Sequence, residues 1–406
     1  MFPHIHRYSI YLHGILLVFP GALLAQDRSS QSQVKSRKVA SQPQQAHLAL
    51  LKGRRWLEQQ QARHGSWQSR TYAGFEGKVA TSALVMSALV EVTPATADQE
   101  LTIRPGLAFL NSKFSQKPLW KSVEAESNYP LYSLSLMLMT LNQIQSDTTA
   151  AQLLRDSLSQ ELLRQQTIIQ PDRVSAGAVA GGWKPGSELF SQRSAVSPAN
   201  VSVTYHALEA LSGARRLPLQ NRNAALDYLQ HIQIPTGAAG AGGFVFTLMP
   251  DHPLNKAGSK RNQAGQQYGV PYLSATCDGI SAMLACDVTS DDQRIQSALA
   301  ALPHLSHSRL AEITLNTEGS YQKLDALYFY EAAATARVWQ QMRNREVPNQ
   351  FLNSRRHQIL QTLIETQHAD GHWENPLPWM MEDDPLIATT FALQALHRCR
   401  TPIDSK

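Results

Sequence analysis

Two kinds of hydrophobic pattern alternate along this chain. In the first kind, apolar residues occupy one helical face while Gln, Arg and Glu occupy the other, as in residues 53–61. In the second kind nearly every residue is small or apolar, as in residues 79–92, and such a helix is buried on all sides. No stretch sustains the two-residue alternation of a strand, so we expect an all-α protein without a sheet of consequence.

Five of the apolar segments share a finer spacing. A small or apolar residue is followed by apolar residues four and seven positions later, which places all three on one face of a helix. A further buried helix, with a weaker pattern, is expected from Lys323 to Trp339. The five triplets are Ser82/Met86/Leu89, Leu134/Leu138/Leu141, Thr204/Leu208/Leu211, Thr276/Ile280/Met283 and Thr389/Leu393/Leu396.

A short turn, usually with glycine before an aromatic residue, joins each amphipathic segment to the apolar one that follows. The clearest copies are His64-Gly65-Ser66-Trp67 and Asp370-Gly371-His372-Trp373. Aromatic residues mark six such units, 52 to 77 residues apart, and are expected to pin the hairpins together. Six helical hairpins close most economically as a ring of buried helices wrapped by amphipathic ones. The marker residues are Trp67, Trp120, Trp183, Phe244, Tyr321 and Trp373.

This repeat resembles that of a known family. A Leu- and Gln-containing helix end followed by Asp/His-Gly-x-Trp is similar to the repeat of squalene and oxidosqualene cyclases and protein prenyltransferase β-subunits. The similarity spans Ala46 to Arg398 and is clearest around Trp67 and Trp373. It implies an α6/α6 toroid with a cavity at the centre of the ring. The toroid hosts cyclases, transferases and non-catalytic domains, so it does not by itself give the activity.

Composition excludes several other classes of protein. Of 406 residues, 43% are hydrophobic and 17% charged, which is too apolar for a disordered chain. Three cysteines cannot form a disulfide framework, and Cys277 and Cys286 would point to opposite sides of one helix, so we expect buried free thiols. The net charge of +5 is spread along the chain without a basic run, which argues against nucleic acid as a partner.

The N-terminus differs from the rest. Residues 1–25 have a basic Arg7, an apolar stretch broken by Pro20-Gly21 and a small Ala25, which predicts a cleaved secretory signal and hence export; a retained anchor is the alternative. The apolar run is too short for a membrane span, so none is expected after cleavage. Residues 26–45 are rich in Gln, Ser, Lys and Arg and predict a disordered tether. Residues 46–406 are then a single toroid domain.

The resemblance also implies chemistry that can be sought in the sequence. Triterpene cyclases protonate an alkene or epoxide with an Asp-x-Asp-Asp motif, and its nearest match here is Met381-Glu382-Asp383-Asp384. Asp383 falls on the proton donor, but Met381 replaces the first Asp. The alternative is that Asp384 and its neighbours form the acidic N-cap of the helix that starts at Leu386.

Protein prenyltransferases instead hold zinc with Asp, Cys and His. Cys277-Asp278 has the reversed order here, and His206 from another buried helix could complete a zinc set. The alternative is a buried structural Cys beside a polar Asp, and we expect neither a metal nor a cofactor.

Other residues depart from the apolar pattern. Glu331 takes an apolar position near Asp325 and Tyr328, so it lines a wet cavity, finds a partner or faces outward. Tyr132, Tyr205 and Tyr328, near the starts of buried helices, are candidates for an aromatic cavity wall or for the core. Residues 247–272 form an insertion that is either a lid or binding loop or a solvated excursion.

Three functions remain open. A toroid that binds an apolar or isoprenoid ligand, with Asp278 and Asp384 as further binding candidates, requires an apolar, aromatic-lined cavity of several hundred Å³. A non-catalytic scaffold that binds another protein predicts a small or filled central cavity and no acid with a strongly shifted pKa. A polysaccharide enzyme requires paired carboxylates in an open polar groove, with Asp325, Glu331 and Asp383 as candidates.

Overall fold

The computed structural model describes residues 41–72, 78–92, 99–127, 129–144, 148–167, 181–186, 198–253, 255–262, 265–310 and 323–400. The predicted signal segment, most of the predicted tether and the predicted marker Tyr321 lie outside these ranges. The first helix begins at Gln42, so the folded region starts four residues earlier than the predicted Ala46. None of the helices in the described ranges has the length and apolar character needed to cross a membrane.

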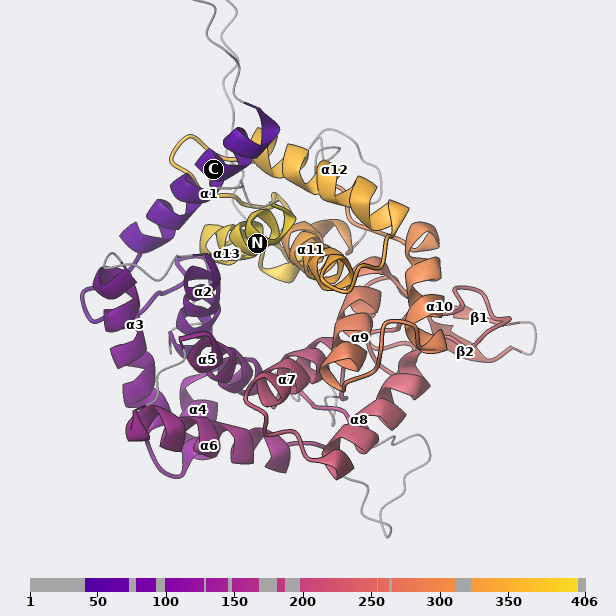
Figure 1. The fold of residues 1–406 in the computed structure, drawn as a ribbon, viewed down its shortest axis with the longest axis horizontal. Coiled ribbons are helices and arrows are strands. Elements are labelled where there is room, and N and C mark those ends of the chain that lie inside the picture. The colour runs from indigo at the N-terminus through magenta and orange to yellow at the C-terminus, as the bar shows by residue number, and fades with distance from the viewer. Residues whose placement is uncertain are drawn as a thin grey trace, which may run out of the picture. The chain divides into compact units, whose positions relative to one another are not determined.

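Six helices form a closed inner ring (Figure 1). Each contacts the next in chain order, and the last contacts the first, which confirms the predicted toroid. The buried triplets lie on these helices, and their apolar composition explains why they take the inner positions. The inner helices are α2 (Val79–Val92), α5 (Pro130–Ile144), α7 (Val201–Gly213), α9 (Leu273–Ala285), α11 (Tyr328–Arg343) and α13 (Pro385–Cys399).

Amphipathic helices surround this ring. They are α1 (Gln42–Gln59), α3 (Gln99–Phe114), α4 (Leu119–Glu126), α6 (Thr149–Arg164), α8 (Leu219–Ile232), α10 (Gln293–Ala301) and α12 (Gln350–Thr366). Trp120 lies in the extra helix α4 and not in a turn, because residues 111–126 contain no glycine and Pro118 is the N-cap of a helix. The helix predicted from Lys323 begins later, at Tyr328, after a 3-10 turn (Asp325–Leu327), and continues to Arg343.

The repeat has a hydrogen-bonding basis. In one unit the backbone N–H of Trp373 donates to Thr389 Oγ1 (3.0 Å), and its indole Nε1 donates to the Leu363 carbonyl of the outer helix (2.8 Å). The aromatic residue therefore joins both helices of its hairpin. The same backbone bond to the first triplet residue recurs as Trp67 to Ser82, Trp183 to Thr204 and Phe244 to Thr276.

A glutamine connects each of four units to the next outer helix. Gln367 Nε2 donates to the carbonyl of Gly371 in its own turn (2.8 Å) and to that of Ala49 in α1 (2.8 Å). The last hairpin is thereby bonded to the first helix of the chain. The equivalent bonds are made by Gln61 to Gly65 and Thr102, Gln166 to Gly181 and Asn221, and Gln233 to Gly242 and Arg294.

The turn glycine is required by the same contact. Gly371 has φ +110°, a conformation that strains an L side chain, and a Cβ there would lie 2.7 Å from the Lys52 carbonyl oxygen. The turn can approach the neighbouring outer helix so closely only without a side chain.

Two further predictions concern the core and the insertion. Cys277, Cys286 and Cys399 are free and buried, as expected. The insertion carries a short antiparallel hairpin of β1 (Ser259–Arg261) and β2 (Gln267–Gly269), in which Lys260 pairs with Tyr268. That pair of three-residue strands is the only sheet among the described residues.

Candidate functional site

The centre of the inner ring contains a cavity of about 330 Å³. Every inner helix contributes to its wall from its first two or three turns, for example Leu84 of α2, Tyr132 of α5 and Phe391 of α13. Because the six helices all present their N-terminal halves to one cavity, they run parallel, and the positive ends of their dipoles are directed at it.

Most of the cavity wall is apolar or aromatic. Trp379 also lines it and is 49% exposed, so this residue of the 3-10 turn Pro378–Met380 lies where the cavity meets solvent. Aromatic faces and aliphatic side chains suit an apolar ligand of moderate size. The apolar and aromatic lining residues include Leu84, Tyr129, Tyr132, Leu136, Phe246, Tyr272, Leu327, Tyr330, Trp379, Met380, Met381, Ile387 and Phe391.

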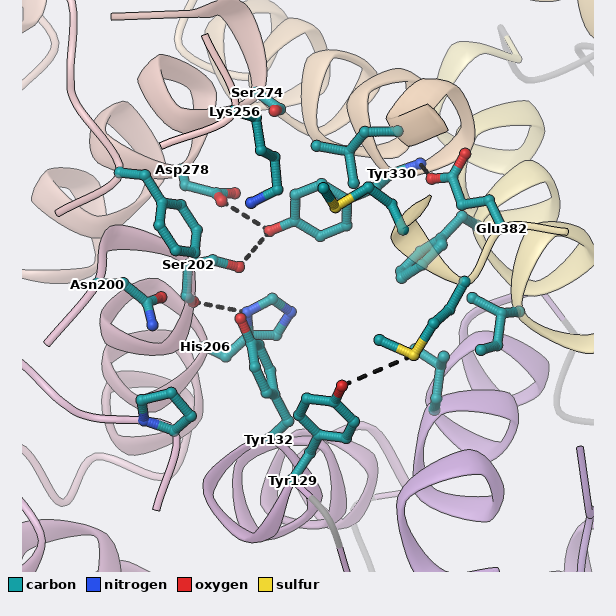
Figure 2. A pocket seen from close by; sticks show the side chains of 18 of the residues that line it. Tyr129, Tyr132, Asn200, Ser202, His206, Lys256, Ser274, Asp278, Tyr330 and Glu382 are labelled. Carbon is teal, nitrogen blue, oxygen red and sulfur yellow. Dashed lines mark hydrogen bonds between the residues drawn. The ribbon is translucent and has the colours of Figure 1, made fainter. Parts of the chain in front are cut away.

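One side of the cavity is polar (Figure 2). The Tyr330 hydroxyl donates to Asp278 Oδ2 (2.7 Å), and Arg337 Nη2 donates to Asp278 Oδ1 (2.6 Å). The Ser202 hydroxyl lies 2.5 Å from the Tyr330 oxygen and donates to it, since the phenolic proton is already used. Burial raises the pKa of Asp278, and the charge of Arg337 opposes that shift.

His206 lines the same side as a neutral imidazole. Its Nδ1 donates to the Ser202 carbonyl (2.8 Å), so its proton resides there and Nε2 is an acceptor. Burial, with smaller contributions from Arg337 and Arg398, lowers the His206 pKa to about 3. The imidazole therefore adds hydrogen-bonding capacity to the wall without charge.

Lys256 reaches the cavity from the insertion. Its ammonium lies 3.8 Å from the centre of the Phe246 ring, and Figure 2 shows it directed toward the Asp278 carboxylate and the Tyr330 hydroxyl. Burial lowers the pKa of Lys256 to about 8. The adjacent Asn255 fixes this part of the insertion, because its Nδ2 donates to the carbonyls of Met249 (2.7 Å) and Pro250 (3.0 Å).

The acidic segment 382–384 divides into three roles. Glu382 lines the cavity and accepts the N–H groups of Tyr330 (2.7 Å) and Phe329 (2.9 Å) at the start of α11; burial raises its pKa to about 8. Asp383 is half-buried and accepts the Tyr72 hydroxyl. Asp384 is the N-cap of α13, as the capping alternative predicted. Of these three acidic residues, Glu382 is the one that lines the cavity, and it is the neighbour of Asp383, the predicted proton donor.

Of the eight predicted site residues, Tyr132 and Asp278 line the cavity and six do not. Glu331 is buried and bonds Arg355 of α12 (3.1 Å) and the Ser308 N–H (3.1 Å). Asp325 is half-buried and accepts the Arg309 N–H (3.3 Å). Tyr205 is buried under the Arg337 guanidinium, 3.7 Å from its ring centre. The others outside the lining are Tyr328, Asp383 and Asp384.

The zinc set considered from sequence does not assemble. Cys277 Sγ lies 3.8 Å from Thr335 Oγ1 and is absent from the cavity wall, and burial raises the Cys277 pKa to about 12, which favours the thiol over the thiolate ligand. Asp278 is bonded to Arg337. Among the described residues, a group with metal-ligand spacing occurs instead in the turn before α13, where His368, His372 and Glu374 place ligand atoms within 4.8 Å of one another, away from the cavity.

The cavity wall carries a signal that sequence reading missed. The lining residues lie two positions before and two positions after the first residue of each triplet, for example Ser202 and His206 around Thr204. Positions two apart on a helix face nearly opposite directions, so the triplets mark the face toward the outer helices and these flanking positions mark the cavity. The other pairs are Ala80/Leu84, Tyr132/Leu136, Ser274/Asp278 and Ile387/Phe391. Lys256 lies in the insertion, outside these helices, so no periodic pattern marked it as a lining residue.

Ring, turns and central cavity together define an α/α toroid, the architecture of the terpenoid cyclase fold. Among solved structures, the type II terpene cyclase MstE from Scytonema, in complex with geranylgeranyl dihydroxybenzoate, matches at TM-score 0.54 and 14% identity, over 88% of this chain and 98% of that one. The alpha-1,6-mannanase GH76A of Salegentibacter sp. HEL1_6, in complex with alpha-1,6-mannotetrose, matches at TM-score 0.52 and 10% identity, over 89% and 99%.

At these identities the similarity shows the fold alone. No protein-family model matches the chain, and no curated protein sequence matches it. The activity must therefore be argued from the cavity itself.

Proposed function

We propose that this protein binds an apolar small molecule, of isoprenoid or comparable character, in the central cavity of its toroid. The observation that carries the proposal is the cavity itself, about 330 Å³ with walls mainly of aliphatic and aromatic side chains. That volume is at the lower end of the roughly 300–1,000 Å³ usual for small-molecule sites. The solved terpene cyclase supports the proposal, since it holds an isoprenoid-bearing ligand on the same fold.

The two alternatives receive less support from the cavity. A scaffold predicts a small or filled central cavity and no acid with a strongly shifted pKa, whereas this cavity has a volume of about 330 Å³ and burial raises the pKa of Glu382 in its wall to about 8. A polysaccharide enzyme needs two carboxylates that act as a pair. Asp278 and Glu382 are the carboxylates in the described lining, and Asp278 is already bonded to Arg337 while Glu382 accepts two backbone N–H groups.

Displacement of a neutral fluorescent probe tests the proposal. N-phenyl-1-naphthylamine is expected to bind the purified protein with increased emission and to be displaced by farnesol. Ala80→Trp fills the cavity from α2 and should weaken probe binding about tenfold or more, whereas Leu153→Trp on the exposed side of α6 should leave it unchanged.

Two results would contradict the proposal. The first is probe binding that Ala80→Trp leaves intact, because the bound molecule would then lie elsewhere. The second is release of reducing sugar from an alpha-1,6-mannan by the wild-type protein, which would favour the polysaccharide alternative.

A further inference from the structure

The cavity is not uniformly apolar, and its polar side contains a buried ammonium group, that of Lys256. Two cations, Arg337 and Lys256, face the single carboxylate of Asp278, and both oxygens of that carboxylate already accept hydrogen bonds. His206 is neutral and adds no charge. The Lys256 ammonium would attract an anion placed beside it, because opposite charges attract strongly in a buried site.

Ser274 supplies a second donor on the same side of the cavity. Its side chain is 1% exposed and lines the cavity, yet its hydroxyl has no hydrogen-bond partner among the described residues. Leaving a buried hydroxyl unsatisfied is unfavourable, so a ligand atom that accepts its proton would be stabilised there. In Figure 2 the labelled Ser274 and Lys256 lie on the same side of the cavity.

The start of α9 adds further donors. Its N-cap, Tyr272, offers no side-chain acceptor, so the first-turn N–H groups of Ser274 and Ala275 are not capped by a side chain, and both residues line the cavity. By contrast, Asn200 caps α7 and Asp384 caps α13. An uncapped helix N-terminus attracts an anion through its N–H groups and its dipole.

We propose that the ligand is amphipathic, with an apolar chain against the aliphatic and aromatic walls and an anionic head group, a carboxylate or a phosphate, bound by Lys256, Ser274 and the first turn of α9. This inference rests on the proposed function, because it presumes that the cavity is a ligand site. It assigns the insertion a role in binding, since Lys256 comes from that segment. An ammonium at this position also disfavours a carbocation in the cavity, because like charges repel.

Three probes that share one isoprenoid chain test the head group: farnesol, farnesoic acid and farnesyl phosphate. Each is titrated against the N-phenyl-1-naphthylamine complex of the full-length protein at pH 7. We expect the acid, the phosphate or both to bind at least about tenfold more tightly than the alcohol, and the stronger of the two identifies the head group.

Variants then assign this preference to the proposed residues. Lys256→Met should remove most of the preference while changing farnesol affinity by less than about threefold, and Ser274→Ala should reduce it by a smaller factor. Lys260→Met is the matched control, because Lys260 is an exposed lysine in strand β1 of the same insertion, and it should behave as wild type. Circular dichroism and thermal unfolding show whether each variant is folded.

The outcomes separate the two proposals. Equal affinity for farnesol and the anionic probes, or a preference that survives Lys256→Met in a folded variant, overturns the anionic head group and leaves the apolar cavity site standing. Failure of all three probes to displace N-phenyl-1-naphthylamine, together with no effect of Ala80→Trp, overturns both.

Discussion

The buried ion pair between Arg337 and Asp278 should be among the costliest contacts in the ring to break. It joins α11 to α9, and the two side chains are 9% and 1% exposed. Arg337→Met removes the 2.6 Å bond to Asp278, a 3.0 Å bond to Ser281 Oγ and the stacking on Tyr205. These contribute about 1.5–3, 0.5–1.5 and 2 kcal/mol. Met recovers part of the packing, so we expect a loss of about 3–5 kcal/mol.

The loss should also depend on pH in a defined direction. Burial raises the Asp278 pKa in the folded protein, so this group stabilises the fold at low pH and that contribution declines as pH rises from the unfolded pKa toward the folded one. Without Arg337, a cause that lowers this pKa is gone and the pKa rises further. The deficit of Arg337→Met should therefore be larger at pH 8 than at pH 5.

Urea unfolding of a double-mutant cycle measures both effects. Asp278→Asn combined with Arg337→Met removes the unpaired charge, so the double variant should be more stable than the sum of the single losses predicts. Arg216→Met is the control, because Arg216 and Asp156 form an ion pair that is about half exposed and should contribute less than about 1 kcal/mol. A loss below about 1 kcal/mol for Arg337→Met, or strictly additive losses, would refute the reasoning.

Three further predictions concern the turns, the core and the cavity. Gly371→Ala should lower the free energy of unfolding by about 2 kcal/mol more than Gly237→Ala in urea titrations. Both glycines have positive φ, but only a Cβ at Gly371 would meet a carbonyl, so equal losses would argue against the close contact. Affinity for an anionic probe should fall above about pH 8 as Lys256 deprotonates beside Asp278, Lys323 and His252, and displacement titrations of Lys256→Met should lack this fall. In an Ellman assay the native protein should show no reactive thiol and the urea-unfolded protein should show three, because all three cysteines are buried: Cys277, Cys286 and Cys399. Fast labelling of the native protein would contradict their burial.

The fold could be predicted from sequence because its repeat is encoded locally. In four of the units the backbone N–H of the turn aromatic donates to a hydroxyl in the first turns of the next buried helix, as Trp373 does to Thr389, so a short motif specifies a whole hairpin. The number of hairpins also predicted that the ring closes. It did not predict the residue at which α11 begins, or the extra helix α4. Tyr328 starts α11 after a 3-10 turn, and Pro118 starts α4, and neither feature belongs to the repeat.

The cavity was harder to predict for a physical reason. The triplets report the face that packs on the outer helices, where shape and hydrogen bonding constrain the residue type. The opposite face has no common residue type, since Leu84, His206 and Asp278 all occupy equivalent positions there. Burial alone did not identify the site either, because Glu331 is as buried as Asp278 but satisfies its charge with Arg355 on the outer side.

The bond from Gln367 to Ala49 has a consequence for the order of the chain. This bond gives the contact between the last and first hairpins the same chemistry as the contacts between consecutive hairpins. Arg400 Nη1 also lies 2.9 Å from His47 Nδ1 at this contact. The contacts between neighbouring hairpins therefore determine the ring, and the position at which the polypeptide starts does not. A circular permutant that links residues 400 and 41 and opens the chain at residues 214–218, between α7 and α8, should fold to the same toroid.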